Sequence, residues 1–130
     1  IGKTLRTICF SKNTKLKLQN GTIKKMKDII LGDVLENGSE VYGTLKLKGG
    51  KDSPYYKIWS EKLNDYIYVT GEHKIFNTDN TDNSLLTNYI SVKDYKDAIK
   101  TGAFDNVLYC LITDNHQIPI GEFTFWDWED

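Results

Sequence analysis

Cys9 and the segment Thr70-Gly71-Glu72-His73 carry the residue types needed to break a peptide bond. The thiol of Cys9 can attack the carbonyl of the preceding Ile8 and convert the Ile8-Cys9 amide into a thioester, which is an N-to-S acyl shift. Thr70 can hydrogen-bond the scissile carbonyl or hold a twisted peptide, and His73 can donate a proton to the departing Cys9 nitrogen. Cys9, Thr70 and His73 are therefore the first candidate catalytic residues.

Three segments, in this order along the chain, resemble the sequence blocks of Hint domains, the module shared by inteins, bacterial intein-like domains and hedgehog autoprocessing domains. They are 9–35, beginning Cys9-Phe10-Ser11; 69–75, Val69-Thr70-Gly71-Glu72-His73-Lys74-Ile75; and 107–116, containing Val107-Leu108-Tyr109-Cys110-Leu111. The resemblance spans roughly Cys9 to Asp130. It implies an all-β horseshoe of many short antiparallel strands and an autocatalytic, single-turnover cleavage of the chain.

The resemblance also implies roles for Cys110 and His116. In most inteins similar to this chain, the position of Cys110 holds an Asp that helps the first acyl shift, whereas a minority carry a Cys that accepts the acyl group. Beside Cys9, Cys110 would be an acyl acceptor, a thiol that tunes Cys9, a disulfide partner or a buried strand residue. His116 is similar to the late histidine that assists C-terminal cleavage, although the spacing is one residue shorter; a turn histidine is the alternative.

The C-terminal segment decides between cleavage and splicing. Splicing inteins end in His-Asn followed by Cys, Ser or Thr, and residues 121–130 contain neither that Asn nor a nucleophile after it. Asp127 falls close to the Asn position, where it would cyclise slowly, act as a base for water or be a structural residue. The sequence therefore predicts cleavage on the N-terminal side only, with a splicing intein truncated at its C-terminal junction as an alternative.

This interpretation divides the chain into two parts. Residues 1–8 are predicted to be the tail of a covalently attached upstream passenger ending at Ile8, and residues 9–130 the Hint-like domain. Water, a thiol or an amine would resolve the thioester, and the β-branched Ile8 would shield it and slow its release. Nothing after Trp128 resembles a sterol-recognition region, which disfavours transfer to cholesterol. We expect a monomer without a cofactor.

Short strands must position these residues. Asn20-Gly21 and Asn37-Gly38 are typical hairpin turns, and Pro119 and Gly121 indicate an interruption or an edge strand. Alternating or β-branched segments predict strands over 4–10, 15–18, 22–24, 40–47, 55–60, 66–70, 107–113 and 123–126. The expected architecture is all-β.

One helix of two to three turns is predicted on the surface over Ser91–Lys100. Ser91 is its expected N-cap, acidic residues lie early in it, and Gly102 follows its end.

Composition excludes several function classes. The 130 residues suffice for one domain. With 17 Lys and Arg against 18 Asp and Glu, the net charge is -1, which disfavours nucleic-acid binding. No apolar run approaches the roughly 18 to 20 residues of a membrane helix, and no secretory signal precedes the strands. Two cysteines are too few for a disulfide scaffold.

Two other function classes are consistent with the same residues. Cys9, His73, Cys110 and His116 offer two sulfurs and two nitrogens for a zinc site, although no short Cys-x-x-Cys pair supports one. A catalytically silent β-rich binding or structural domain is the other class, with its aromatic residues holding a ligand. The polar stretch 77–84 lacks the glycine and distal Glu of a calcium loop, so no metal is expected there.

Overall fold

The structure is a computed structural model that describes residues 8–77 and 88–128. Within these ranges it contains β1 (Lys15–Lys17), β2 (Ile23–Lys25), η1 (Met26–Asp28), β3 (Val41–Lys48), β4 (Tyr55–Ser60), β5 (Asp65–Thr70), β6 (Lys74–Phe76), β7 (Tyr89–Ser91), η2 (Val92–Asp94), β8 (Ile99–Lys100), β9 (Val107–Thr113), β10 (Gln117–Ile120) and β11 (Phe123–Trp126). Both η elements are short 3-10 turns. No helix in the described ranges is long enough to cross a membrane.

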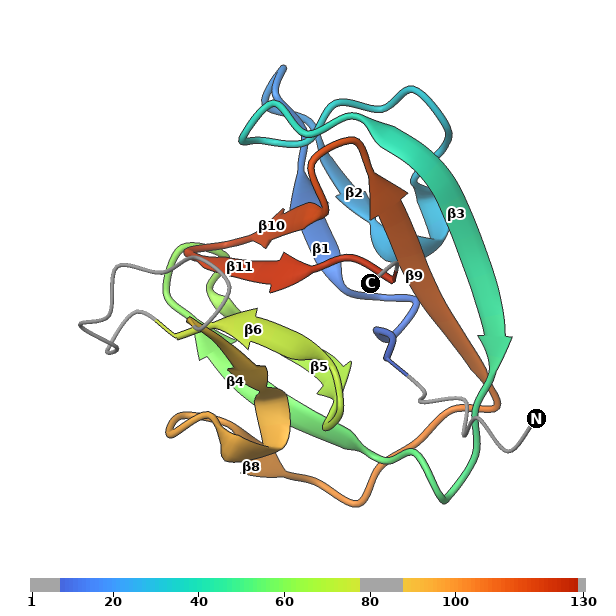
Figure 1. Cartoon of the computed structure of the whole chain (residues 1–130), viewed down its shortest axis with the longest axis vertical. Helices are drawn as coiled ribbons and strands as arrows, with labels where there is room; N and C mark the ends of the chain where they lie inside the picture. The colour runs from blue at the N-terminus through green and yellow to red at the C-terminus, as the bar shows by residue number, and fades with distance from the viewer. Residues whose placement is uncertain (1–7, 78–87, 129–130) are drawn as a thin grey trace.

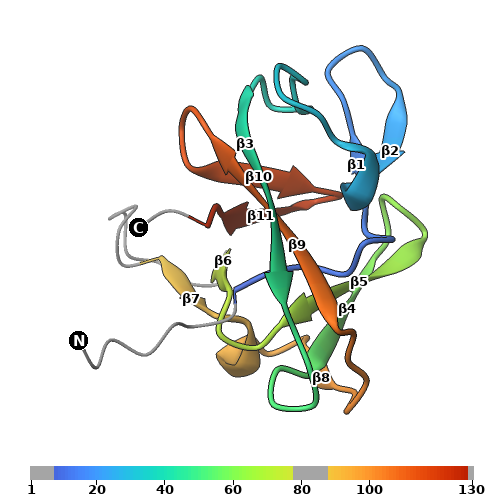
Figure 2. The same cartoon turned by 90° about the vertical axis from the view of Figure 1, so that its right-hand side faces the viewer.

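The short segment around Phe10 joins two groups of strands. β3 and β9 pair over their whole length as one antiparallel ribbon (Figures 1 and 2), and β4 lies between β5 and β8. Phe10 forms an antiparallel bridge to Val69 of β5 on one side and to Tyr109 of β9 on the other. The N-terminal segment is therefore the central member of a layer that runs β3, β9, Phe10, β5, β4, β8.

A second sheet carries the last described residues, in the strand order β10-β11-β6-β7 (Figures 1 and 2). β10 is at the edge of this sheet, which explains how it accommodates Pro119, a residue without a ladder donor. β1 and β2 form a separate hairpin.

The two sheets enclose a shared apolar core. Phe10 from the first layer and Phe125 from β11 are fully buried, and their rings meet edge to face with centroids 5.1 Å apart. Burying such a side chain contributes roughly 1.5–3 kcal/mol. This contact fixes the N-terminal segment against the C-terminal strand, which matters for the site described below.

The all-β prediction and most strand predictions are confirmed. β4 and β5 pair as the predicted hairpin from Tyr55↔Thr70 to Ser60↔Asp65, and Gly21 and Gly38 adopt positive φ in the predicted turns. The predicted strand over 4–10 lies mainly outside the described residues, as does most of the polar stretch 77–84.

The predicted helix over Ser91–Lys100 is wrong. Ser91 ends β7, only Val92–Asp94 form a 3-10 turn, and Ile99–Lys100 is strand β8. The turn stops at Tyr95, which donates to the Val92 carbonyl at 2.9 Å and adopts extended backbone with φ -78° and ψ 131°, and Ile99 and Lys100 pair with Lys57 and Tyr56 of β4. Strand pairing with β4 thus overrides the local helix signal.

Candidate active site

Strand pairing places Cys9 between Thr70 and Cys110. Because Phe10 is opposite Val69 and Tyr109 in antiparallel bridges, the preceding Cys9 lies opposite the following residue on each neighbour, Thr70 and Cys110. Cys9 and Cys110 are buried, free thiols. Three residues far apart in the sequence therefore form one row across the layer.

Thr70 holds the nitrogen side of the Ile8-Cys9 bond. The Cys9 N–H donates to Thr70 Oγ1 at 3.0 Å, in a buried hydrogen bond, and the Thr70 N–H donates to the Cys9 carbonyl at 3.0 Å. In an uninterrupted ladder the Cys9 N–H would bond to a backbone carbonyl. Here a side-chain hydroxyl takes that place, so the Ile8-Cys9 amide has a threonine as its acceptor.

A tight turn carries the chain from Thr70 to His73. The His73 N–H donates to the Thr70 carbonyl at 3.2 Å. Gly71 is required in this turn, because a Cβ there would meet a ring carbon of Tyr56 at 2.7 Å. The turn brings His73 back towards the Cys9 segment, as the Thr-x-x-His spacing predicts.

His73 is fully buried between two phenylalanine rings and a backbone carbonyl. Its ring lies 4.5 Å from that of Phe10 and 5.8 Å from that of Phe125, measured between centroids. Its Nε2 lies 2.6 Å from the carbonyl oxygen of Trp126. A carbonyl can only accept, so this contact assigns the proton to Nε2 and leaves Nδ1 with the lone pair in the neutral ring.

Burial lowers the pKa of His73 to about 4, although the Trp126 carbonyl and the backbone of Ile8 act in the opposite direction. The ring is therefore neutral near pH 7. Nδ1 has no hydrogen-bond partner among the described residues, while the Ile8 backbone is near enough to affect the His73 pKa. The neutral resting ring therefore presents Nδ1 as an acceptor, and proton donation by His73 to the Cys9 nitrogen stays a prediction.

Cys110 is a neutral thiol beside Cys9. Its Sγ donates weakly to the Leu111 carbonyl at 3.8 Å. Burial, and next the neighbouring Cys9 side chain, raise the pKa of Cys110 well above its ordinary value. Cys110 is therefore protonated and uncharged near pH 7.

His116 and Asp127 form a hydrogen-bonded pair near Cys110. The Nδ1 of His116 lies 3.1 Å from Asp127 Oδ2, and that oxygen accepts the N–H of Thr113 at 3.0 Å. His116 occupies the β9–β10 turn with a φ of 64°, and its ring stacks on Trp126 at 5.3 Å. Asp127 is also close enough to Cys110 to contribute to its raised pKa. The structure thus brings all six predicted residues into one region.

Trp126 was missed by sequence reasoning. Its carbonyl fixes the His73 tautomer, and its ring supports His116. A backbone carbonyl carries no residue-type signal, so no sequence pattern would have found it.

The geometry does not support the zinc alternative. No group of three or more His, Cys, Asp or Glu residues within 8–77 and 88–128 is placed to hold a metal ion. His73 Nε2 faces a carbonyl, and His116 Nδ1 faces Asp127.

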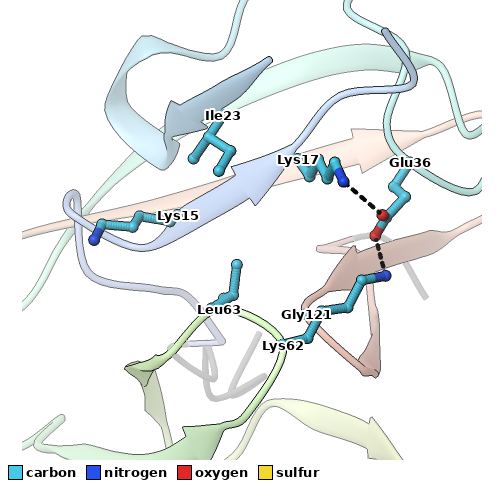
Figure 3. Close-up of a pocket in the computed structure, with 7 residues that line it drawn as sticks. All are labelled: Lys15, Lys17, Ile23, Glu36, Lys62, Leu63 and Gly121. Atoms are coloured by element: carbon cyan, nitrogen blue, oxygen red, sulfur yellow. Dashed lines mark hydrogen bonds and ion pairs between the residues drawn. The ribbon is translucent and has the colours of Figure 1, made fainter. Parts of the chain in front are cut away.

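A separate pocket of about 260 Å³ lies between the β1–β2 hairpin and the β4–β5 turn (Figure 3). Glu36 pairs with Lys62 at 2.8 Å and approaches Lys17 at 4.0 Å. Lys15 pairs with Asp65 at 3.1 Å. Each lysine lining this pocket therefore has a carboxylate partner, and we assign the pocket no function.

Comparison with known proteins shows an intein-like fold. The crystal structure of gp41-1 intein superposes with a TM-score of 0.61 at 16% sequence identity, covering 94% of this chain and 100% of that one. A triply substituted variant of gp41-1 intein gives a TM-score of 0.62 at 17% identity, covering 93% and 100%. No family model and no curated protein matches the sequence. These likenesses agree with the Hint resemblance of the sequence.

Proposed function

We propose that this chain is an intein-like self-processing domain that cleaves the Ile8-Cys9 peptide bond through a thioester on Cys9. One observation carries the proposal: Thr70 Oγ1 accepts the Cys9 N–H, while the fully buried His73 lies near the Ile8 backbone. A hydroxyl and an imidazole thus flank the one bond that Cys9 can attack.

The reaction follows from these positions. The Cys9 sulfur attacks the Ile8 carbonyl carbon, and the new C–S bond replaces the C–N bond. The thiol proton passes to Nδ1 of His73 and from there to the Cys9 nitrogen, which leaves as a free amine. Since a pKa of about 4 makes His73 a weak base, we expect the acyl shift to be slow.

Thr70 favours the same step. By accepting the Cys9 N–H at 3.0 Å, it fixes the orientation of the scissile amide relative to His73. Water, a thiol or an amine then resolves the thioester and releases a passenger that ends at Ile8.

Cleavage without splicing is favoured by the state of Asp127. Its side chain is buried and is committed to Thr113 and His116. An Asp held in this way is poorly placed to attack its own carbonyl, and Trp128, which follows it, offers no nucleophile. We therefore assign the His116–Asp127 pair a structural role in holding the C-terminal strand against the site.

The test is a fusion of a longer passenger that ends at Ile8, followed by intact-mass spectrometry with and without an added thiol. We expect thiol-stimulated release at Ile8-Cys9. Cys9→Ala should abolish release, and Cys110→Ala serves as the matched control because it removes the neighbouring thiol and leaves the nucleophile. An intact precursor under every condition would contradict the proposal and favour a silent β-rich binding or structural domain.

A further inference from the structure

We propose that Cys9 and Cys110 form a modification site that hydrogen peroxide oxidises to a disulfide, which holds the passenger on the chain until the disulfide is reduced. The inference rests on the proposed cleavage at Ile8-Cys9, because the nucleophile of that reaction is one of the two sulfurs.

The backbone pairing sets the spacing of the two cysteines. Phe10 and Tyr109 exchange both backbone hydrogen bonds, at 2.8 and 3.0 Å, so they are a hydrogen-bonded pair. The adjoining pair, Cys9 and Cys110, is then a non-hydrogen-bonded pair, in which the Cα atoms lie about 4.5 Å apart and the side chains are closest. Disulfides span Cα separations of about 4.4–6.8 Å, so the two sulfurs can join without moving the strands.

The two side chains also lie on the same face of the layer. Directly opposed residues of an antiparallel pair point to one side, and the neighbouring Cys9 side chain contributes to the raised pKa of Cys110. Both thiols are free in this structure. The two thiols are therefore both reduced and already lie side by side.

A small pocket has Cys110 as one of its lining residues. It has a volume of about 50 Å³ and is walled by Met26, Ile29 and Leu45. Lys27 and Lys46 line it as exposed residues at its rim. A site needs only about 10–15 Å³ to admit one water, so a two-oxygen molecule such as hydrogen peroxide fits, whereas a peptide disulfide such as oxidised glutathione does not.

The oxidation balances in two steps. The Cys110 thiolate attacks one oxygen of hydrogen peroxide, the O–O bond breaks, and the hydroxide that leaves takes up the thiol proton to become water. The product is a sulfenic acid on Cys110. The Cys9 thiol then attacks that sulfur, the S–O bond breaks, a second water leaves and the S–S bond forms. The two thiols supply the two electrons that reduce peroxide to two waters.

The raised pKa of Cys110 makes the first step slow. Because only the thiolate reacts, oxidation should accelerate as the pH rises. Once the disulfide forms, the Cys9 sulfur cannot attack Ile8, so the acyl shift stops.

The first experiment tests disulfide formation in a chain that does not release its passenger. In a passenger-fused chain carrying His73→Gln to suppress release, we expect hydrogen peroxide to produce a linked Cys9–Cys110 peptide in non-reducing mass mapping. Oxidised glutathione should produce it far more slowly, and a Cys110→Ser chain should not produce it. Separate sulfinic acids, or no linkage in the folded chain, would overturn the inference.

The consequence is tested in the wild-type fusion. Peroxide pretreatment should stop passenger release, and a phosphine should restore it, since a phosphine reduces disulfides without accepting the acyl group as a thiol does. Release that continues in linked chains would overturn the inference and leave the proposed function intact. A linked peptide in a chain that never releases its passenger would instead refute the proposed function and support the oxidisable pair.

Discussion

The buried His73 should make the free energy of unfolding fall in acid. Substituting His73 should remove this part of the pH dependence. The folded pKa of about 4 lies below the value near 6.5 of an unfolded histidine, so the unfolded chain binds more protons between these values. This preference of protons for the unfolded chain destabilises the folded state. The effect is absent above about pH 7.5 and grows as the pH falls through 6.5. It is complete below pH 4.

The magnitude follows from the two pKa values. Linkage with 6.5 unfolded and about 4 folded gives a loss of about 2 kcal/mol in the free energy of unfolding at pH 5, relative to pH 7.5. His73→Gln removes the titrating ring and retains a donor that can reach the Trp126 carbonyl. The variant should therefore lose about 2 kcal/mol less than the parent over this pH range.

The assay is urea unfolding at pH 7.5, 6 and 5, with Cys9→Ala in both chains so that neither processes. Comparing the pH dependence of the two chains cancels the carboxyl groups that both contain, including Asp65 and Glu122, whose lowered pKa values also reduce stability in acid. Equal losses in the two chains between pH 7.5 and pH 5 would refute the assignment of His73 as a buried, neutral base.

Three further predictions concern the site and its supports. Thr70→Val should slow passenger release and cost about 1–3 kcal/mol of stability, because the buried N–H of the scissile amide loses its acceptor; unchanged release in mass spectrometry would contradict its role. Cys110→Asp should speed release relative to Cys110→Ala, because it supplies a carboxylate base; equal rates would show that no base is needed at this position. Gly121→Ala should cost about 1–3 kcal/mol in urea unfolding, because its Cβ would collide with a serine side chain at a φ of +59°. Gly32→Ala should cost less stability than Gly121→Ala, because Gly32 has a φ of +89° but open space around it. Equal losses in the two variants would rule out the collision at Gly121.

The sequence predicted local features well wherever short-range chemistry determines them. The Asn20-Gly21 turn and the hairpin of β4 and β5 follow from turn residues and β-branched runs. The helix prediction over Ser91–Lys100 failed, because Tyr95 adopts extended backbone and Ile99–Lys100 pairs with β4. A local signal cannot include partners that are distant in the sequence.

The sequence named the six candidate residues that act through their side chains, but not Trp126, whose backbone carbonyl contacts His73. Cys9, His73, Cys110 and Asp127 stand at positions similar to those of the Hint blocks, and residue type alone states what each side chain can do. That Cys9 lies opposite Cys110 depends on the bridge between Phe10 and Tyr109, which joins strands about a hundred residues apart, a pairing that short-range pattern does not encode.

The sequence by itself determined the fold class and the inventory of reactive groups, since periodicity and turn chemistry are local properties. Only the tertiary structure decided the electrostatic state of those groups. His73 is neutral and Cys110 is protonated because packing removes both from water. The Trp126 carbonyl that orients His73 belongs to β11, the last strand among the described residues. Desolvation and backbone partners belong to the assembled fold, and residue identity does not specify them.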